Sequence, residues 1–192
     1  MLKIKSFAKI NIGLEVLYKR DDGFHEINTV FAKIGLFDEI IIEPYKELFV
    51  ECIPSLDIHQ EQNLAYKSGK LIQNLFACKS KGAKITILKK IPLGGGLGGG
   101  SSNAAYVMIG LNKFWDINAS ESELQRISSQ LGSDVPFFFG GNFAIGKGKG
   151  EILEYFDFRL PYHILLVIPK VKINTTWAYS KLDRGKELRT AS

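Results

Sequence analysis

The sequence predicts an α+β fold, and three observations carry this prediction. The N-terminal segment alternates between apolar and polar residues, which is typical of a strand. Apolar residues recur at helical spacing in the middle of the chain, and strand-like segments return after residue 136. This order of several strands, helix, strand, two helices and more strands differs from the regular alternation of parallel α/β folds.

Residues 3–17 form the first predicted strand, followed by a turn at Arg20–Gly23 and two further strands at 27–34 and 39–43. Strand periodicity divides the first segment into two faces. The face expected in the core carries Ile4, Ala8, Ile10, Ile12, Leu14 and Val16. The polar face carries Lys3, Lys5, Phe7, Lys9, Asn11 and Glu15.

The middle of the chain predicts three helices. Asn63 is the expected N-cap of the first, and a short strand follows at 83–89. The second helix begins directly after a glycine-rich loop, with Ser101 and Ser102 in its first turn. Ser120 and Glu123 have the spacing of a capping box for the third, which Gly132 is expected to end.

The C-terminal part predicts strands at 137–145 and 151–158 around a glycine turn at 146–150. A third, fully apolar strand is expected at 163–169 and a helix at 175–182.

Composition narrows the class of protein. The 192 residues suffice for a sizeable core, and no apolar stretch reaches the length of a membrane-spanning helix. The net charge of +5 suits an anionic small molecule, and no long basic block points to nucleic acid. The N-terminus lacks a secretory signal, and two cysteines make no disulfide framework. We therefore expect a cytoplasmic protein without a zinc site or a membrane partner.

The loop at 92–103 is the strongest local signal, because six of the seven residues 94–100 are glycine. Glycines allow close approach of the backbone to a phosphate, and a following helix N-terminus attracts its charge. The P-loop pattern fails because Gly100 stands where lysine is required. The dinucleotide pattern GxGxxG matches, but a glycine run satisfies it easily. A flexible linker is the alternative, disfavoured by the loop's place between a strand and a helix.

Three segments together resemble the GHMP kinases, and within them the branch that phosphorylates 4-diphosphocytidyl-2-C-methyl-D-erythritol. They read FAKINIGLEVLYKRDDGFHEINTVF, PLGGGLGGGSSNAA and LGSDVPFFFGGNFAIGKGKGE. Phe7 stands where the family usually has proline, and Phe24 where it usually has tyrosine. The resemblance implies an N-terminal domain like domain 2 of ribosomal protein S5 over residues 1–160. Residues 161–192 are then the beginning of a C-terminal domain, of which most is expected to be missing.

The resemblance also implies roles for particular residues. Lys9 would stabilise charge at the reacting hydroxyl, and Asp134 would accept its proton as the catalytic carboxylate. ATP, together with Mg²⁺, would lie on the glycine loop. The residues expected to bind it are Asn63, Pro92, Leu93, Gly94, Gly95, Gly96, Leu97, Gly98, Gly99, Gly100, Ser101 and Ser102. The residues expected to bind the cytidine substrate are Asn11, Phe24, His25, Thr175 and Tyr179. No residue is assigned as a metal ligand.

Without the resemblance, several of these residues have plainer interpretations. Lys9 would be a solvated strand lysine, Asp134 a turn residue and His25 a surface residue. Ser101 and Ser102 would simply cap a helix. The function implied is ATP-dependent phosphorylation of the substrate's 2-hydroxyl in the non-mevalonate route to isoprenoids. The alternatives are another small-molecule GHMP kinase, or a nucleotide-binding fragment without turnover.

Overall fold

The computed structural model describes residues 1–78, 81–169 and 175–182. Within them, six strands form one mixed sheet in which β1 pairs with β2, and the other neighbours follow the order β3-β4-β2-β5-β6. The pairing of β3 with β4 is parallel and the others are antiparallel. The strands are β1 (Leu2–Lys19), β2 (His25–Glu43), β3 (Leu48–Ile53), β4 (Ala83–Leu88), β5 (Phe143–Lys147) and β6 (Ile152–Phe156).

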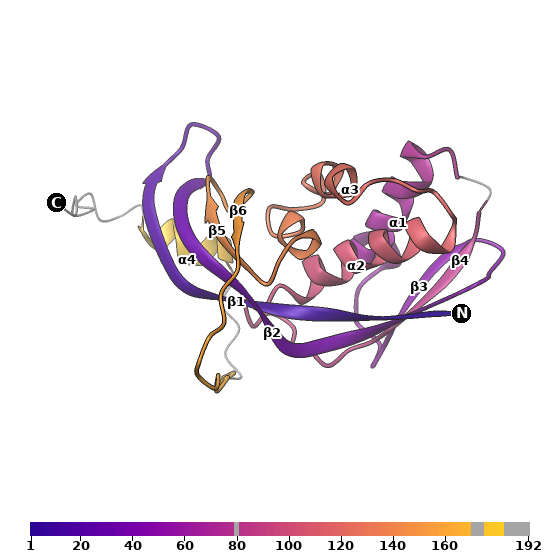
Figure 1. Ribbon diagram of the computed structural model, residues 1–192, viewed down its shortest axis with the longest axis horizontal. Helices are drawn as coiled ribbons and strands as arrows, with labels where there is room; N and C mark the ends of the chain where they lie inside the picture. Colours follow the sequence, from indigo (N-terminus) through magenta and orange to yellow (C-terminus); the bar gives the residue numbers. More distant parts are fainter. Residues whose placement is uncertain (79–80, 170–174, 183–192) are drawn as a thin grey trace.

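The helices α1, α2 and α3 lie together on one side of the sheet, and α4 lies near the curved end of β1 and β2 (Figure 1). This arrangement confirms the predicted α+β class. The α-helices are α1 (Leu64–Leu75), α2 (Gly99–Phe114), α3 (Glu121–Ser128) and α4 (Thr175–Leu182), and the short 3₁₀ helices are η1 (Gln60–Gln62) and η2 (Pro136–Phe139).

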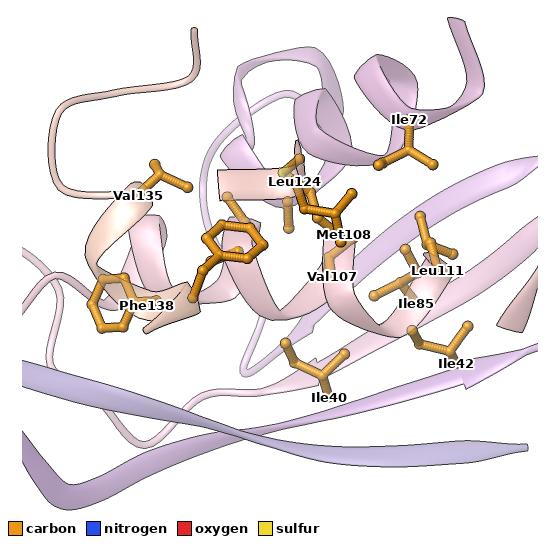
Figure 2. Packing of buried hydrophobic residues seen from close by; sticks show 14 of the residues in the cluster. Ile40, Ile42, Ile72, Ile85, Val107, Met108, Leu111, Leu124, Val135 and Phe138 are labelled. Atoms are coloured by element: carbon orange, nitrogen blue, oxygen red, sulfur yellow. The ribbon is translucent and has the colours of Figure 1, made fainter. Parts of the chain in front are cut away.

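The main core fills the space between the sheet and these helices (Figure 2). Side chains on one face of β2 and β4 pack against apolar side chains of all three helices. Every second residue of a strand points to the same face of the sheet, and residues three or four apart share one face of a helix. The fully buried members include Ile40, Ile42, Ile72, Ile85, Val107, Met108 and Leu111. Gly110 lets α2 approach closely, because a Cβ there would lie 2.5 Å from Ile42 and 2.8 Å from Ile4. This contact fixes α2, and with it the loop that precedes α2.

Local signals for the helices are confirmed. The Asn63 side chain accepts a hydrogen bond from Ala65 N at 2.9 Å, and Ser120 accepts one from Glu123 N at 3.2 Å. Two boundaries differ from the prediction. The second helix begins at Gly99, ahead of the two serines, and the third ends at Ser128, before Gly132 is reached.

Several predicted strands are wrong or incomplete. The segments 27–34 and 39–43 are parts of the single strand β2, which runs without a break from His25 to Glu43. It pairs with β1 on both sides of a register shift between Lys33 and Phe37. Residues 136–139 form η2, since Pro136 occupies a first-turn helical position. Residues 163–169 form no strand, and β3 was not foreseen.

The first strand also departs from strict alternation. Its register with β2 shifts between Phe7 and Lys9 and again between Asn11 and Gly13. Such irregularities re-aim the side chains that follow them. Ile12 and Leu14, expected in the core, are 48% and 50% exposed, whereas Lys9 is buried.

Candidate active site

The glycine loop connects the end of β4 to the first turn of α2. Gly94, Gly96 and Gly98 have φ angles of +73°, +71° and +66°, which L-residues with side chains rarely adopt. Gly98 is the N-cap of α2, so the free N–H groups of that helix begin at the loop. Together with Leu64, Lys89 and Ile91, residues 92–101 line a pocket of about 230 Å³. A shallow pocket of backbone amides at a helix N-terminus suits a phosphate chain.

Lys9 and Asp134 meet beside this loop. Lys9 Nζ lies 3.2 Å from Asp134 Oδ2, although the two residues come from β1 and from the turn before η2. The Lys9 side chain is 7% exposed, while that of Asp134 is 34% exposed. The carboxylate is therefore accessible to a ligand, whereas the ammonium is held inside.

The loop contacts Lys9 directly. The backbone N–H of Lys9 donates to the Leu97 carbonyl at 2.9 Å. A Cβ at Gly98 would lie 2.9 Å from Lys9 Cγ. The phosphate-binding candidate and the ion pair are thus parts of one continuous site.

Asn11 extends the site along β1. Its Oδ1 accepts a hydrogen bond from Lys9 Nζ at 2.8 Å, and its Nδ2 donates to Thr29 Oγ1 at 2.7 Å. Thr29 in turn donates to the Gly13 carbonyl at 2.6 Å. These bonds fix which way the Asn11 amide faces. Sequence reasoning missed Thr29, because a buried threonine in a strand carries no local signal of a role.

An aromatic cluster lies at the other end of the site. The rings of His25 and Tyr179 are 5.2 Å apart, which brings α4 against the start of β2. Burial, and secondarily the charge of Asp134, raises the pKa of Tyr179. Phe24 is 53% exposed, and Lys149 Nζ lies 4.5 Å from its ring centre. The expected stacking of a base between Phe24 and Tyr179 stays a prediction.

Some of the remaining predicted residues lie at the loop pocket, whereas Ser102 is buried in the core. Asn63 caps α1 next to Leu64, which lines the loop pocket, and Ser101 lines the same pocket. Ser102 lies elsewhere: it is fully buried and its hydroxyl donates to the Phe7 carbonyl at 2.6 Å. This placement disagrees with the phosphate contact expected of Ser102. Thr175 is the first residue of α4, and its side chain lies outside the described residues.

Two further features concern membranes and metal ions. In the described part of the chain, no helix is long and apolar enough to cross a membrane. The same residues contain no group of three or more histidine, cysteine, aspartate or glutamate side chains placed to hold a metal ion.

Comparison with known proteins identifies the family that this chain resembles. Residues 63–142 match the N-terminal domain of the GHMP kinases. A Chlorobium limicola protein named 4-diphosphocytidyl-2-C-methyl-D-erythritol kinase is 45% identical over 179 residues, 93% of this chain and 62% of the relative. A Thermodesulfovibrio yellowstonii protein of the same name is 42% identical over 99% of this chain and 66% of its own length. The chain therefore spans slightly less than two thirds of these relatives.

Solved structures show the same fold. A crystal structure of 4-(cytidine 5'-diphospho)-2C-methyl-D-erythritol kinase superposes with a TM-score of 0.68 at 36% identity, covering 80% of this chain and 54% of that one. The mevalonate kinase of Methanococcus jannaschii reaches a TM-score of 0.61 at 14% identity, covering 81% and 56%. The second similarity concerns the fold alone.

Proposed function

Because the chain belongs to the GHMP kinase family, we propose that its protein transfers a phosphate from ATP to the 2-hydroxyl of 4-diphosphocytidyl-2-C-methyl-D-erythritol. This reaction lies on the non-mevalonate route to isoprenoids, and we place it in the cytoplasm. The observation that carries the proposal is the Lys9–Asp134 pair, held against the glycine loop through Leu97 and Gly98. It puts an accessible carboxylate and a cation beside a candidate phosphate site.

In this mechanism Asp134 accepts the proton of the substrate hydroxyl as that oxygen attacks the γ-phosphate. Lys9 stabilises the negative charge that develops on the oxygen. Asn11 is held by Lys9 and Thr29, and its amide orients the substrate near the pair. Phosphoryl transfer depends mostly on such positioning and on electrostatic stabilisation, so no covalent intermediate with the protein is required.

The loop amides and the N-terminus of α2 bind the ATP phosphates, and Leu64 with Asn63 borders the adenine side. Mg²⁺ neutralises phosphate charge when it is bound. In kinases it is held largely by phosphates and water, so a site without a carboxylate cluster accommodates it. Ser101 is the hydroxyl that we propose beside the phosphates.

The cytidine preference rests on the aromatic cluster. The paired rings of His25 and Tyr179 offer one stacking surface and one hydrogen-bonding edge, which suit a nucleobase better than a small hydroxy acid. Phe24 would cover the other face of the base.

An ADP-release assay with a panel of acceptors tests this proposal. We expect turnover with the cytidine diphosphate derivative of methylerythritol and none with mevalonate or homoserine. Turnover of another acceptor instead would assign the chain to a different small-molecule kinase. ATP binding without ADP release from any acceptor would show a nucleotide-binding fragment without turnover.

A further inference from the structure

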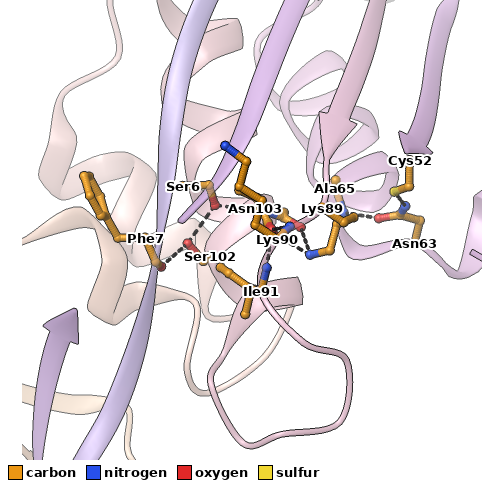
Figure 3. Close-up of polar contacts among 11 residues, drawn as sticks. Ser6, Phe7, Cys52, Asn63, Ala65, Lys89, Lys90, Ile91, Ser102 and Asn103 are labelled. Carbon is orange, nitrogen blue, oxygen red and sulfur yellow. Dashed lines mark hydrogen bonds and ion pairs between the residues drawn. The ribbon is translucent and has the colours of Figure 1, made fainter. Parts of the chain in front are cut away.

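A buried polar cluster lies at the base of the glycine loop, and Lys89 is its one member that also lines the loop pocket. We call it the loop clasp and define it as Asp38 of β2, Lys89 after β4, and Asn103 of α2. Figure 3 shows Lys89 and Asn103 side by side at the base of the loop. The Asp38 side chain is fully buried, and that of Lys89 is 6% exposed. Charges are rarely removed from water in this way unless they are fully paired.

The two carboxylate oxygens of Asp38 hold opposite ends of the loop. Oδ1 accepts hydrogen bonds from the backbone N–H groups of Lys90 and Ile91, at 2.6 and 2.8 Å, directly before the loop. Oδ2 pairs with Lys89 Nζ and accepts from Asn103 Nδ2 at 2.9 Å, in the helix α2 that follows the loop glycines. Lys89 also donates to Asn103 Oδ1 at 2.9 Å, which closes the triangle.

The clasp continues to the strand that carries Lys9. Asn103 Nδ2 donates to Ser6 Oγ at 2.9 Å, and the hydroxyls of Ser6 and Ser102 lie 2.7 Å apart. Ser102 then donates to the Phe7 carbonyl, two residues before Lys9. One set of hydrogen bonds therefore joins β1, the residues before the loop and the helix after it.

A buried ion pair is weak evidence for stability, because desolvation of both charges offsets their attraction. The pair nevertheless restricts the local geometry, because a buried charge that loses one of its partners is strongly destabilised. The loop itself gains little order from its own side chains, because six of its residues are glycine. A binding loop that is ordered before its ligand arrives loses less entropy on binding.

We propose that Asp38 is a positioning residue that fixes both ends of the loop and so preorganises its amides for the ATP phosphates. The inference rests on the proposed function, since it assumes that this loop binds ATP. It assigns no contact with ATP to Asp38, which acts through the loop backbone and through Asn103.

The test measures binding of a non-hydrolysable ATP analogue to the folded protein. Asp38→Asn combined with Lys89→Met removes both buried charges together, which limits the loss of stability. Asn103→Leu keeps the ion pair but cuts its connection to α2. Lys84→Met is the matched control, because this lysine lies on the same β4 strand and pairs with Glu51 at the sheet surface.

We expect each clasp variant to bind the analogue about 10- to 100-fold more weakly, because the loss of one hydrogen bond to a charged phosphate has an effect of this order. The KM for ATP should rise similarly while the KM for the acceptor stays unchanged. Circular dichroism confirms that the variants are folded at the assay temperature, and a purely structural role would leave the affinity of folded molecules unaltered.

The controls separate two kinds of failure. If wild type and Lys84→Met bind the analogue and either folded clasp variant binds it equally well, the positioning role of Asp38 is wrong. If wild type itself does not bind the analogue, the proposed function is wrong, and the inference falls with it.

Discussion

The ammonium of Lys9 lies 3.2 Å from the carboxylate of Asp134, between a strand at the start of the chain and a turn after α3. The same ammonium donates to Asn11, and the Lys9 backbone donates to the loop carbonyl of Leu97. A shift of the loop would therefore move Lys9, and with it the partner of Asp134. The candidate phosphate site and the Lys9–Asp134 ion pair therefore behave as one geometric unit.

Asp134→Asn tests the assigned proton acceptor. Asparagine keeps the shape of the side chain but cannot take the proton from the hydroxyl. A positioned acid–base group contributes about 10²- to 10⁴-fold to a rate, so kcat of the kinase should fall by that order. Affinity for ATP should stay nearly unchanged, because the loop is intact. Steady-state ADP release and analogue binding measure the two quantities.

Asp157→Asn is the control for that experiment, since Asp157 is an exposed carboxylate away from Lys9. Its kcat should equal that of wild type. Near-normal turnover by Asp134→Asn would remove the carboxylate from the mechanism.

The glycine loop makes a prediction about backbone conformation. Gly96 and Gly98 both have positive φ angles, so Gly96→Val and Gly98→Val should strain the loop. A side chain at position 98 would also meet Lys9 and Phe138, at 2.9 and 3.1 Å from its Cβ. Both variants should bind ATP more weakly, and Gly98→Val should additionally lower kcat. Analogue binding and ADP release distinguish the two effects.

Gly95→Ala is the matched control within the same loop. Gly95 lacks a positive φ, and its added Cβ would make ordinary contacts of 3.7 Å with Leu97. ATP affinity close to wild type is expected. If both valine variants also bind normally, the phosphates lie somewhere else.

The sequence predicted those helices whose ends are marked by neighbouring residues. The caps at Asn63 and Ser120 were visible because a side chain and a nearby amide make each one. The apolar run at 137–139 was wrongly predicted as part of a strand, because a short apolar segment fits a strand or a helical turn equally well. β3 forms by pairing in parallel with β4, which lies about thirty residues later in the sequence. The residues of β3 alone do not indicate this partner.

The site residues likewise divide into those that the sequence indicates and those that only the folded chain brings together. The sequence identified the loop, and the family resemblance supplied Lys9 and Asp134. Strand periodicity alone placed Lys9 among solvated residues, because the register shift after Phe7 and the cover from Leu97 arise only in the folded chain. Asp38 was missed for the same reason: its partners come from the residues that follow β4 and from α2, far along the sequence.

Tyr179 carries a prediction about the acceptor. Tyr179→Ala removes the ring that contacts His25, and stacking of a base on an aromatic ring is worth about 1–3 kcal/mol. The KM for the proposed cytidine substrate should rise roughly tenfold, whereas the KM for ATP should not change. Tyr179→Phe should retain wild-type values, because it keeps the ring.

Tyr45→Ala serves as the control, because Tyr45 lies in the β2–β3 connection and contacts Phe49. It should leave both KM values unaltered. An unchanged acceptor KM in Tyr179→Ala would place the base outside this cluster.

Lys33 of β2 holds a partly buried amine near η2. Its Nζ donates to the carbonyls of Phe138 and Gly140, at 3.2 and 2.6 Å. Burial lowers the pKa of Lys33 from 10.5 to about 8, and the charge of Glu121 opposes this only in part. The protonated amine is therefore less favourable in the folded protein than in the unfolded chain.

The last prediction concerns the effect of this amine on stability. Below pH 8 both states bind the Lys33 proton, and between pH 8 and 10.5 only the unfolded state keeps it. Stability rises with pH wherever the unfolded state binds more protons, so Lys33 should stabilise the fold increasingly through this window. The contribution is lost again as the pH falls through 8. A difference of one pKa unit between the folded and unfolded states corresponds to at most about 1.4 kcal/mol in the free energy of unfolding. Because the amine is only partly buried, we expect a total change in the free energy of unfolding on the order of 1 kcal/mol.

Urea unfolding gives the free energy of unfolding of wild type and of Lys33→Met at pH 7.5 and at pH 10. The change between the two pH values is compared for the two proteins, so that the contribution of Lys33 is separated from that of other groups that titrate. Equal changes in the two proteins would show that Lys33 has an ordinary pKa in the folded state.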